Sequence, residues 1–169
     1  MPNRVLIIDT SVLCCWLRIP GKETAGPVND RWDHGRIDTL LHAERQRGST
    51  FVLPIATLIE TGNHIAQCSG DRFQLATSLA GHLRDSADAQ TPWAAFTEQA
   101  DLWDQEHLRQ LADSWPPLAA GQLSIGDATI KTVAEFYASA GMHVQIITGD
   151  AGLKAYEPAA PPPVPRRRR

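Results

Sequence analysis

The sequence predicts an α/β protein built around a parallel sheet, and three features indicate this fold. Residues 5–8 are four consecutive branched apolar residues, too short for a buried helix and typical of a central strand covered on both faces. Residues 144–148 form a similar strand near the other end of the chain. Between them, apolar residues recur mainly at helical spacing, and right-handed crossovers through helices make such strands parallel.

The composition is that of one ordinary globular domain. Of 169 residues, 43% are hydrophobic and 21% are charged, and no apolar run approaches the roughly 20 residues that a membrane span needs. The N-terminus lacks the pattern of an export signal. Three cysteines, two of them adjacent, give neither a disulfide framework nor a zinc spacing, so we expect reduced core thiols. We therefore expect a cytoplasmic protein without a membrane partner.

The net charge of −3 is unevenly distributed along the chain. Residues 1–165 hold 12 basic and 19 acidic residues, a balance of −7, and four arginines at 166–169 add back four charges. An acidic body needs metal ions and locally clustered Lys or Arg to bind a polyanion. We expect a folded domain at 1–157 and a disordered Pro/Arg-rich tail at 158–169, because the tail's composition cannot form a core.

Breakers and apolar spacing divide the first half of the chain. Gly and Pro residues indicate a loop and helix ends, and Pro suits the first turn of a helix. The expected elements are a loop at 18–28, a helix from Asn29 or Asp30 to Gly48, a strand at 51–53, a helix that opens at Pro54 and a helix at 71–84.

A further helix is expected over 91–115. Thr91 and Pro92 form a cap and first-turn pair, and Pro116 and Pro117 end the pattern. Three of the five tryptophans fall in this segment and could stack on bases. Large aromatic residues at three- and four-residue spacing are more often core, which is the interpretation that we favour.

Four acidic residues stand at the ends of these apolar elements or beside them. Asp9 follows the first strand and Asp150 the last, and the carboxyl ends of parallel strands share one sheet edge. Asp127 opens a helix expected over 124–141, and Glu60 lies in the helix after Pro54. The aspartates also have a structural alternative, because each could simply cap a helix.

Convergence of these acids would create a site for a hard cation. Clustered carboxylates repel one another unless a cation lies among them, and oxygen ligands favour Mg²⁺ or Mn²⁺ over zinc or copper. One or two such ions can activate water against a phosphodiester. The array therefore predicts metal-dependent phosphodiester hydrolysis.

The acids and their surroundings resemble the PIN-domain ribonucleases, especially the VapC-like toxins. The similarity covers most of residues 4–154. The matching segments are Asp9-Thr10-Ser11, Glu60 in the Pro54 helix, Leu-Ser-Ile-Gly-Asp-Ala-Thr-Ile at 123–130 and Ile-Thr-Gly-Asp-Ala-Gly-Leu at 147–153. The chain differs from the family at Ser11, where many relatives have Asn, in a longer segment at 71–117 and in the absence of an evident closing strand after Leu153.

The resemblance implies a three-layer α/β/α sandwich and a Mg²⁺- or Mn²⁺-dependent endoribonuclease. RNA is the implied substrate. A toxin of this kind would also bind a cognate antitoxin protein and form a homodimer. The resemblance implies catalytic and metal-ligand roles for Asp9, Glu60, Asp127 and Asp150, and a polar supporting role for Ser11 and Thr148.

Two lysines are candidates for phosphate contacts. Lys131 and Lys154 lie one turn after Asp127 and Asp150, although lysines that face solvent are commoner than lysines that bind substrate.

Two other functions remain open at this stage. A phosphotransferase of the haloacid dehalogenase type also has an aspartate after its first strand, but its second aspartate would stand where this chain has Ser11, and a later acid where it has Lys154. A catalytically inactive PIN fold could act as a binding module, in which case divalent ions would give no thermal shift.

Overall fold

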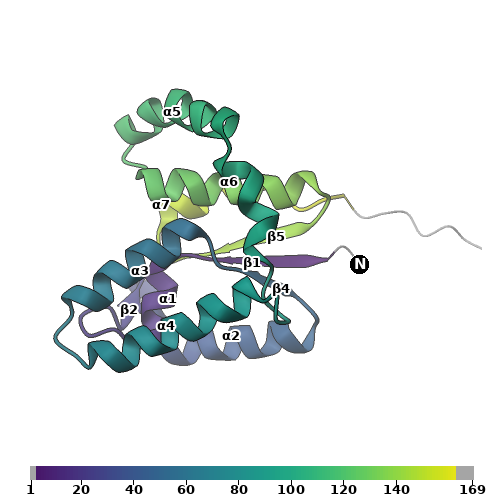
Figure 1. Cartoon of the computed structure of the whole chain (residues 1–169). Helices are drawn as coiled ribbons and strands as arrows, with labels where there is room; N and C mark the ends of the chain where they lie inside the picture. The colour runs from purple at the N-terminus through teal and green to yellow at the C-terminus, as the bar shows by residue number, and fades with distance from the viewer. Residues whose placement is uncertain (1–2, 163–169) are drawn as a thin grey trace, which may run out of the picture.

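The computed structural model describes residues 3–162 and shows a three-stranded parallel sheet flanked by helices (Figure 1). The strand order is β4-β1-β5. The first strand, β1 (Arg4–Ile8), is central and pairs in parallel with β4 (Thr50–Val52) and with β5 (His143–Ile147). The predicted α/β class, the parallel sheet and the central first strand are confirmed.

The remaining elements connect these strands. In chain order they are α1 (Thr10–Leu17), β2 (Thr24–Ala25), η1 (Val28–Asp30), β3 (Trp32–Asp33), α2 (His34–Gln46), α3 (Ile55–Gln67), α4 (Arg72–Ala87), η2 (Phe96–Trp103), α5 (Gln105–Ala120), α6 (Ile125–Ser139) and α7 (Ala151–Lys154). Within the described residues, no helix is long and apolar enough to cross a membrane.

Alternating side chains of β1 pack into two separate cores. Leu6 and Ile8 lie with the buried residues of α1 and α2, whereas Val5 and Ile7 lie with those of α6. All four are fully buried. Successive strand side chains point to opposite faces, so helices on both faces explain why this run is continuously apolar. Figure 1 shows α6 on one side of the sheet and α2 on the other.

The cysteines and the first tryptophan of the predicted aromatic segment belong to the core. Cys14, Cys15 and Cys68 are buried and free, as expected for reduced core thiols. Trp93 is also buried and packs edge-on against Phe51, with 5.7 Å between the ring centroids. The core interpretation is therefore confirmed for Trp93.

The predicted loop at 18–28 contains a strand, and α2 begins later than expected. Ala25 of β2 pairs in antiparallel with Trp32 of β3, which buries Trp32 beside the core instead of placing it in a helix. Asp33 then caps α2 by accepting a hydrogen bond from Arg36 N at 2.8 Å. The prediction of a helix start at Asn29 or Asp30 was wrong because the chain first forms this hairpin.

The predicted helix at 91–115 was also wrong. Phe51 N donates to Pro92 O and Ala94 N donates to Phe51 O, both at 2.8 Å, so Trp93 forms a parallel bridge with β4. The chain then forms η2 and the separate helix α5, which Asp104 caps by accepting from His107 N.

The paired prolines do not end α5. Pro116 and Pro117 lie inside the helix, although a proline removes the bond to the carbonyl four residues earlier. Those carbonyls belong to Ala112 and Asp113, which are exposed, so water can satisfy them. The prediction that the two prolines end the helix was therefore wrong.

The outer edge of β5 is covered by two side chains, one at the end of α7 and one just after it. Ile146 N donates to Glu157 Oε2 at 2.7 Å, and Lys154 Nζ donates to Ile146 O at 2.9 Å. Lys154 and Glu157 also form an ion pair with each other. These contacts occupy the backbone groups that a further strand would use. Of the predicted tail, residues 158–162 have no regular secondary structure and residues 163–169 lie outside the described part of the chain.

Candidate active site

The carboxyl edge of the sheet forms a pocket of about 450 Å³, here called the acid pocket. All four acids singled out from the sequence line it. Asp9 and Asp150 follow β1 and β5, Glu60 comes from α3, and Asp127 comes from the first turn of α6. The other lining residues are Thr10, Ser11, Cys14, Lys22, Thr24, Ala25, His64 and Ser124.

Asp9 is the most firmly held of the acids. It is buried, with 4% of its surface exposed, and it caps α1. Its Oδ2 accepts hydrogen bonds from Ser11 Oγ at 2.6 Å, from Thr148 Oγ1 at 2.7 Å and from Ser11 N at 3.3 Å. Because these bonds converge on one oxygen, Oδ1 remains available for another ligand.

The two hydroxyls that hold Asp9 also connect the ends of β1 and β5. Ser11 Oγ accepts from Gly149 N at 3.0 Å, and Thr148 Oγ1 accepts from Asp150 N at 2.9 Å. Each hydroxyl thus donates to Asp9 and accepts from an amide that follows β5. Serine at position 11 is therefore sufficient to fix the orientation of this carboxylate.

Glu60 lies against the start of α6. Its Oε2 accepts a hydrogen bond from Thr10 Oγ1 at 2.8 Å. Its Oε1 lies so close to Gly126 that a Cβ at that position would collide with it. A residue with a side chain at 126 would displace the Glu60 carboxylate, so the glycine before Asp127 keeps room for an acid from another helix.

Asp127 is half-buried and shares the electrostatic field of the other three acids. Burial is the main cause that raises its pKa, and the negative charges of Asp9, Asp150 and Glu60 raise it further. Its backbone N–H donates to Ser124 Oγ at 3.0 Å, so the expected N-terminal cap of α6 is present. The capping geometry and the proximity to the other acids therefore coexist.

Asp150 is exposed and caps α7. Its Oδ1 accepts from Gly152 N at 2.7 Å and from Leu153 N at 3.4 Å. The second carboxylate oxygen takes no part in these two bonds. The helix cap that the sequence offered as an alternative is thus real, and it leaves one oxygen for a further role.

The donor set of the acid pocket fits a hard divalent cation. Asp9, Glu60 and Asp150 each use one carboxylate oxygen in the hydrogen bonds described above, and oxygen ligands are those that Mg²⁺ and Mn²⁺ prefer. Across residues 3–162, no three His, Cys, Asp or Glu side chains stand close enough to form a ready-made cluster. Ligation by all four acids therefore requires side-chain rotation within the pocket.

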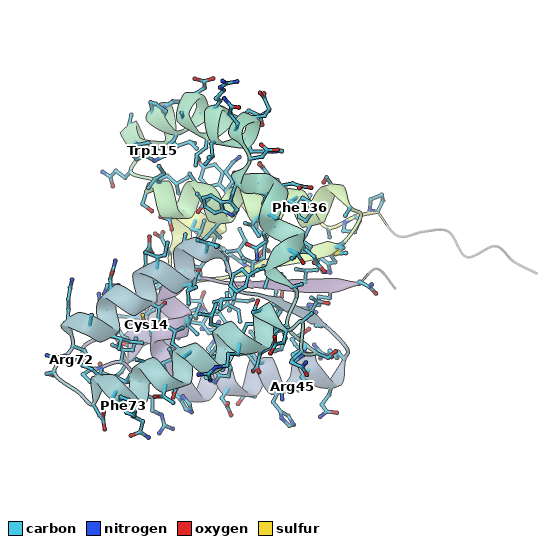
Figure 2. The ribbon with its side chains drawn as sticks, viewed as in Figure 1. Cys14, Arg45, Arg72, Phe73, Trp115 and Phe136 are labelled. Carbon is cyan, nitrogen blue, oxygen red and sulfur yellow. The ribbon has the colours of Figure 1, made fainter. Side chains whose placement is uncertain are left out.

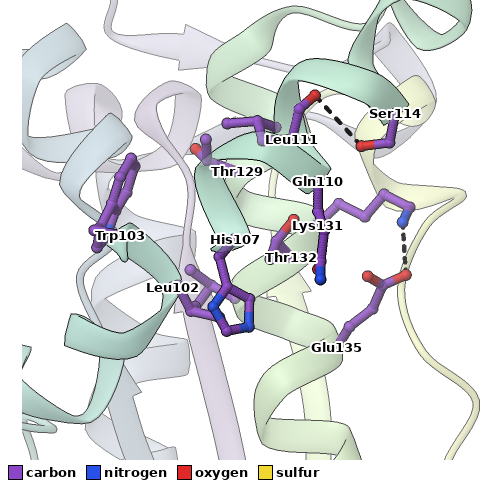
Figure 3. Close-up of a pocket in the computed structure, with 11 residues that line it drawn as sticks. Leu102, Trp103, His107, Gln110, Leu111, Ser114, Thr129, Lys131, Thr132 and Glu135 are labelled. Atoms are coloured by element: carbon purple, nitrogen blue, oxygen red, sulfur yellow. Dashed lines mark hydrogen bonds and ion pairs between the residues drawn. The ribbon is translucent and has the colours of Figure 1, made fainter. Parts of the chain in front are cut away.

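The two lysines proposed from the sequence do not line the acid pocket. Lys131 Nζ donates to Glu135 Oε1 at 2.6 Å beside a different pocket, which lies between α5 and α6 (Figure 3). Lys154 is engaged at the edge of β5 with Glu157 and Ile146.

Two other basic residues line the acid pocket instead. Lys22 lies in the segment before β2, where only the folded hairpin brings it to the acids, so no local pattern could have identified it. His64 lies one turn after Glu60 in α3, and this helical spacing was a usable signal.

Comparisons with known protein families, with curated proteins and with solved structures find no match to this chain. The assignment of a function therefore depends on the geometry of the acid pocket.

Proposed function

We propose that this protein is a Mg²⁺- or Mn²⁺-dependent endoribonuclease of PIN-like three-layer architecture. Its metal ligands are Asp9, Glu60, Asp127 and Asp150. One observation carries the proposal: acids from four separate elements line a single pocket at the carboxyl edge of a parallel sheet, which is where open α/β folds bind ligands.

Each part of the pocket has a chemical role in this proposal. One or two bound ions would neutralise the carboxylates, activate water against a phosphodiester and stabilise the leaving oxygen. Ser11 and Thr148 fix the Asp9 carboxylate through Oδ2 and leave Oδ1 to ligate. Burial is the main cause of the raised pKa of Asp127, and the negative charges of the other three acids, which a cation would offset, raise it further.

The residues around Asp9 argue against the phosphotransferase alternative. That chemistry needs a second aspartate where this chain has Ser11, and the Ser11 hydroxyl already bonds Asp9 Oδ2 and Gly149 N. The position of a later acid is taken by Lys154, whose ammonium contacts Ile146 O. The nuclease function is therefore the better fit. We further propose that the nuclease acts as a toxin that binds a cognate antitoxin protein and forms a homodimer.

The direct test is cleavage of RNA by the purified full chain. Mixed RNAs are incubated with Mg²⁺, Mn²⁺ or EDTA, and the product ends are sequenced. We expect defined ends with either metal, no cleavage in EDTA, and none by an Asp9→Asn variant that is purified in parallel to exclude a contaminating nuclease.

Metal binding is measured separately by thermal melting. Mn²⁺ should raise the melting temperature by mass action, and Asp9→Asn should reduce that rise. An absence of both cleavage and thermal shift would favour the inactive binding module over the nuclease.

A further inference from the structure

Lys22 brings a positive charge to a pocket dominated by carboxylates. It lines the acid pocket together with Asp9, Glu60, Asp127 and Asp150. Its charge also acts on the Cys14 thiol of the same pocket, where it opposes the rise in pKa that burial causes. Lys22 therefore belongs to the electrostatic environment of the site.

The backbone that carries Lys22 is anchored on the core side. Ile19 is fully buried and its N–H donates to Cys14 O at 3.1 Å, and Lys22 N donates to Ile19 O at 2.8 Å. Pro20 packs so closely on Gly70 that a Cβ there would lie 2.7 Å from Pro20 Cγ. These contacts fix the turn between α1 and Lys22.

The hairpin that follows Lys22 is anchored on the end of β5. A Cβ at Gly149 would lie 2.7 Å from Gly26 N and 2.8 Å from Ala25 Cβ, so the two backbones pack in direct contact. Gly149 directly precedes Asp150. The close packing therefore ties the Lys22 hairpin to the strand end that supplies one of the acids.

Lys22 keeps its charge free of a carboxylate partner. Lys131 pairs with Glu135 and Lys154 pairs with Glu157, whereas Lys22 makes no ion pair with any acid in residues 3–162. A lysine that shares a pocket with several acids yet pairs with none is available to a ligand of negative charge.

We propose that Lys22 is a substrate-binding residue whose ammonium contacts a phosphate oxygen of the RNA held at the acid pocket. This inference rests on the proposed nuclease function. Four carboxylates and two divalent ions would balance in charge, and a phosphodiester would then add one negative charge that Lys22 offsets.

The test compares Lys22→Met and Lys22→Arg with Arg18→Met, which removes the same charge from an exposed residue of the same turn. The full-length proteins cleave a fluorescent random-sequence RNA in Mn²⁺, and apparent KM, kcat and melting temperature are recorded. We expect Lys22→Met to raise apparent KM about tenfold, as loss of a charge-assisted hydrogen bond does. Lys22→Arg should recover most of this loss. Arg18→Met should match the wild type, and the Mn²⁺ thermal shift should persist throughout.

The outcomes separate this inference from the proposed function. If the wild type cleaves RNA but Lys22→Met has the same apparent KM as Arg18→Met, the role of Lys22 is wrong and the nuclease stands. A lower melting temperature in Lys22→Met that Lys22→Arg does not restore would show a structural role and likewise overturn the inference. If the wild type shows no metal-dependent cleavage, the proposed function fails, and the inference fails with it.

Discussion

The carboxyl edge of the sheet and helix α5 are held in place by different means. At the edge, the hydroxyls of Ser11 and Thr148 link Asp9 to the amides that follow β5, and Asp9 is itself buried. No residue of α5 is buried within the described chain, and the helix packs mainly on α6 and η2, away from the sheet (Figure 1).

The contacts of α5 are correspondingly sparse. Trp115, labelled in Figure 2, is half-buried. Its Nε1 donates to Leu123 O at 3.1 Å. A pocket of about 260 Å³ remains between α5 and α6. Regions with few buried apolar contacts open locally at low free energy. The comparison indicates that the Asp9 carboxylate is held by a buried hydrogen-bond network, whereas α5 is held by partly exposed contacts with α6 and η2.

Acid-to-amide substitutions at the sheet edge and in α5 should differ most, and the difference should appear in the rate of RNA cleavage. Asp127→Asn keeps the shape of the side chain but removes its charge, so we expect RNA cleavage to fall by more than about 100-fold as metal binding is lost. Asp113→Asn, the same change on an exposed residue of α5, should leave cleavage unchanged. Cleavage rates of the two variants in Mn²⁺ check this. Full activity of Asp127→Asn would return Asp127 to a capping role.

Asp127→Asn, which should abolish most of the cleavage, should stabilise the fold when divalent ions are absent. Because the pKa of Asp127 is raised in the folded protein, its protonated form stabilises the fold at low pH, and this contribution is lost as pH rises through the raised pKa. Urea unfolding in EDTA should therefore show Asp127→Asn to be more stable than the wild type at neutral pH. The difference should shrink as pH falls below the ordinary range of an aspartate.

A smaller effect is expected when the link between β1 and β5 is cut. Thr148→Val removes the hydroxyl that donates to Asp9 and accepts from Asp150 N, and the loss of a hydrogen bond to the buried Asp9 carboxylate costs about 1–3 kcal/mol of unfolding free energy. Thr97→Val, at an exposed position in η2, should cost close to nothing. Urea unfolding in EDTA measures both. Equal stability of the two variants would show that the link does not hold the edge together.

Sequence reasoning succeeded where structure follows from neighbours in the chain. The run at 5–8 is apolar because both faces of β1 are covered, and acids placed directly after β1 and β5 reach the same edge by topology alone. Asp127 could be placed because its capping pattern is local.

Sequence reasoning failed where distant backbone contacts override the local pattern. The segment at 91–95 has a helix-opening sequence, but its backbone forms a parallel bridge with Phe51 of β4 instead. Lys22 reaches the acids only because Gly149 lets the hairpin approach β5. Pairings of this kind depend on residues far apart in the chain, and neither hydrophobic spacing nor turn signals encode them.

Substitution at the outer edge of β5 should cost less unfolding free energy than Thr148→Val but more than a substitution in α5. Glu157→Ala removes the acceptor of Ile146 N and the partner of Lys154, and we expect a loss of about 1 kcal/mol in unfolding free energy because the site is partly exposed. Truncation directly after Glu157 keeps these contacts, so the melting temperature should stay unchanged. A loss of the thermal transition on that truncation would show that residues 158–169 contribute to the fold.

The smallest effect is expected on α5 itself. Leu108 is 44% exposed, so Leu108→Ala removes little buried surface and should change the free energy of unfolding by less than about 0.5 kcal/mol. Leu79→Ala in α4, where the leucine is 6% exposed, should cost about 2–5 kcal/mol and serves as the buried reference. Native-state hydrogen exchange adds a second readout, because amides of α5 should exchange through local opening while those of β1 exchange only on global unfolding. If Leu108→Ala destabilised the protein as much as Leu79→Ala, or if α5 were protected as strongly as β1, the two regions would unfold as one unit and the contrast between them would be wrong.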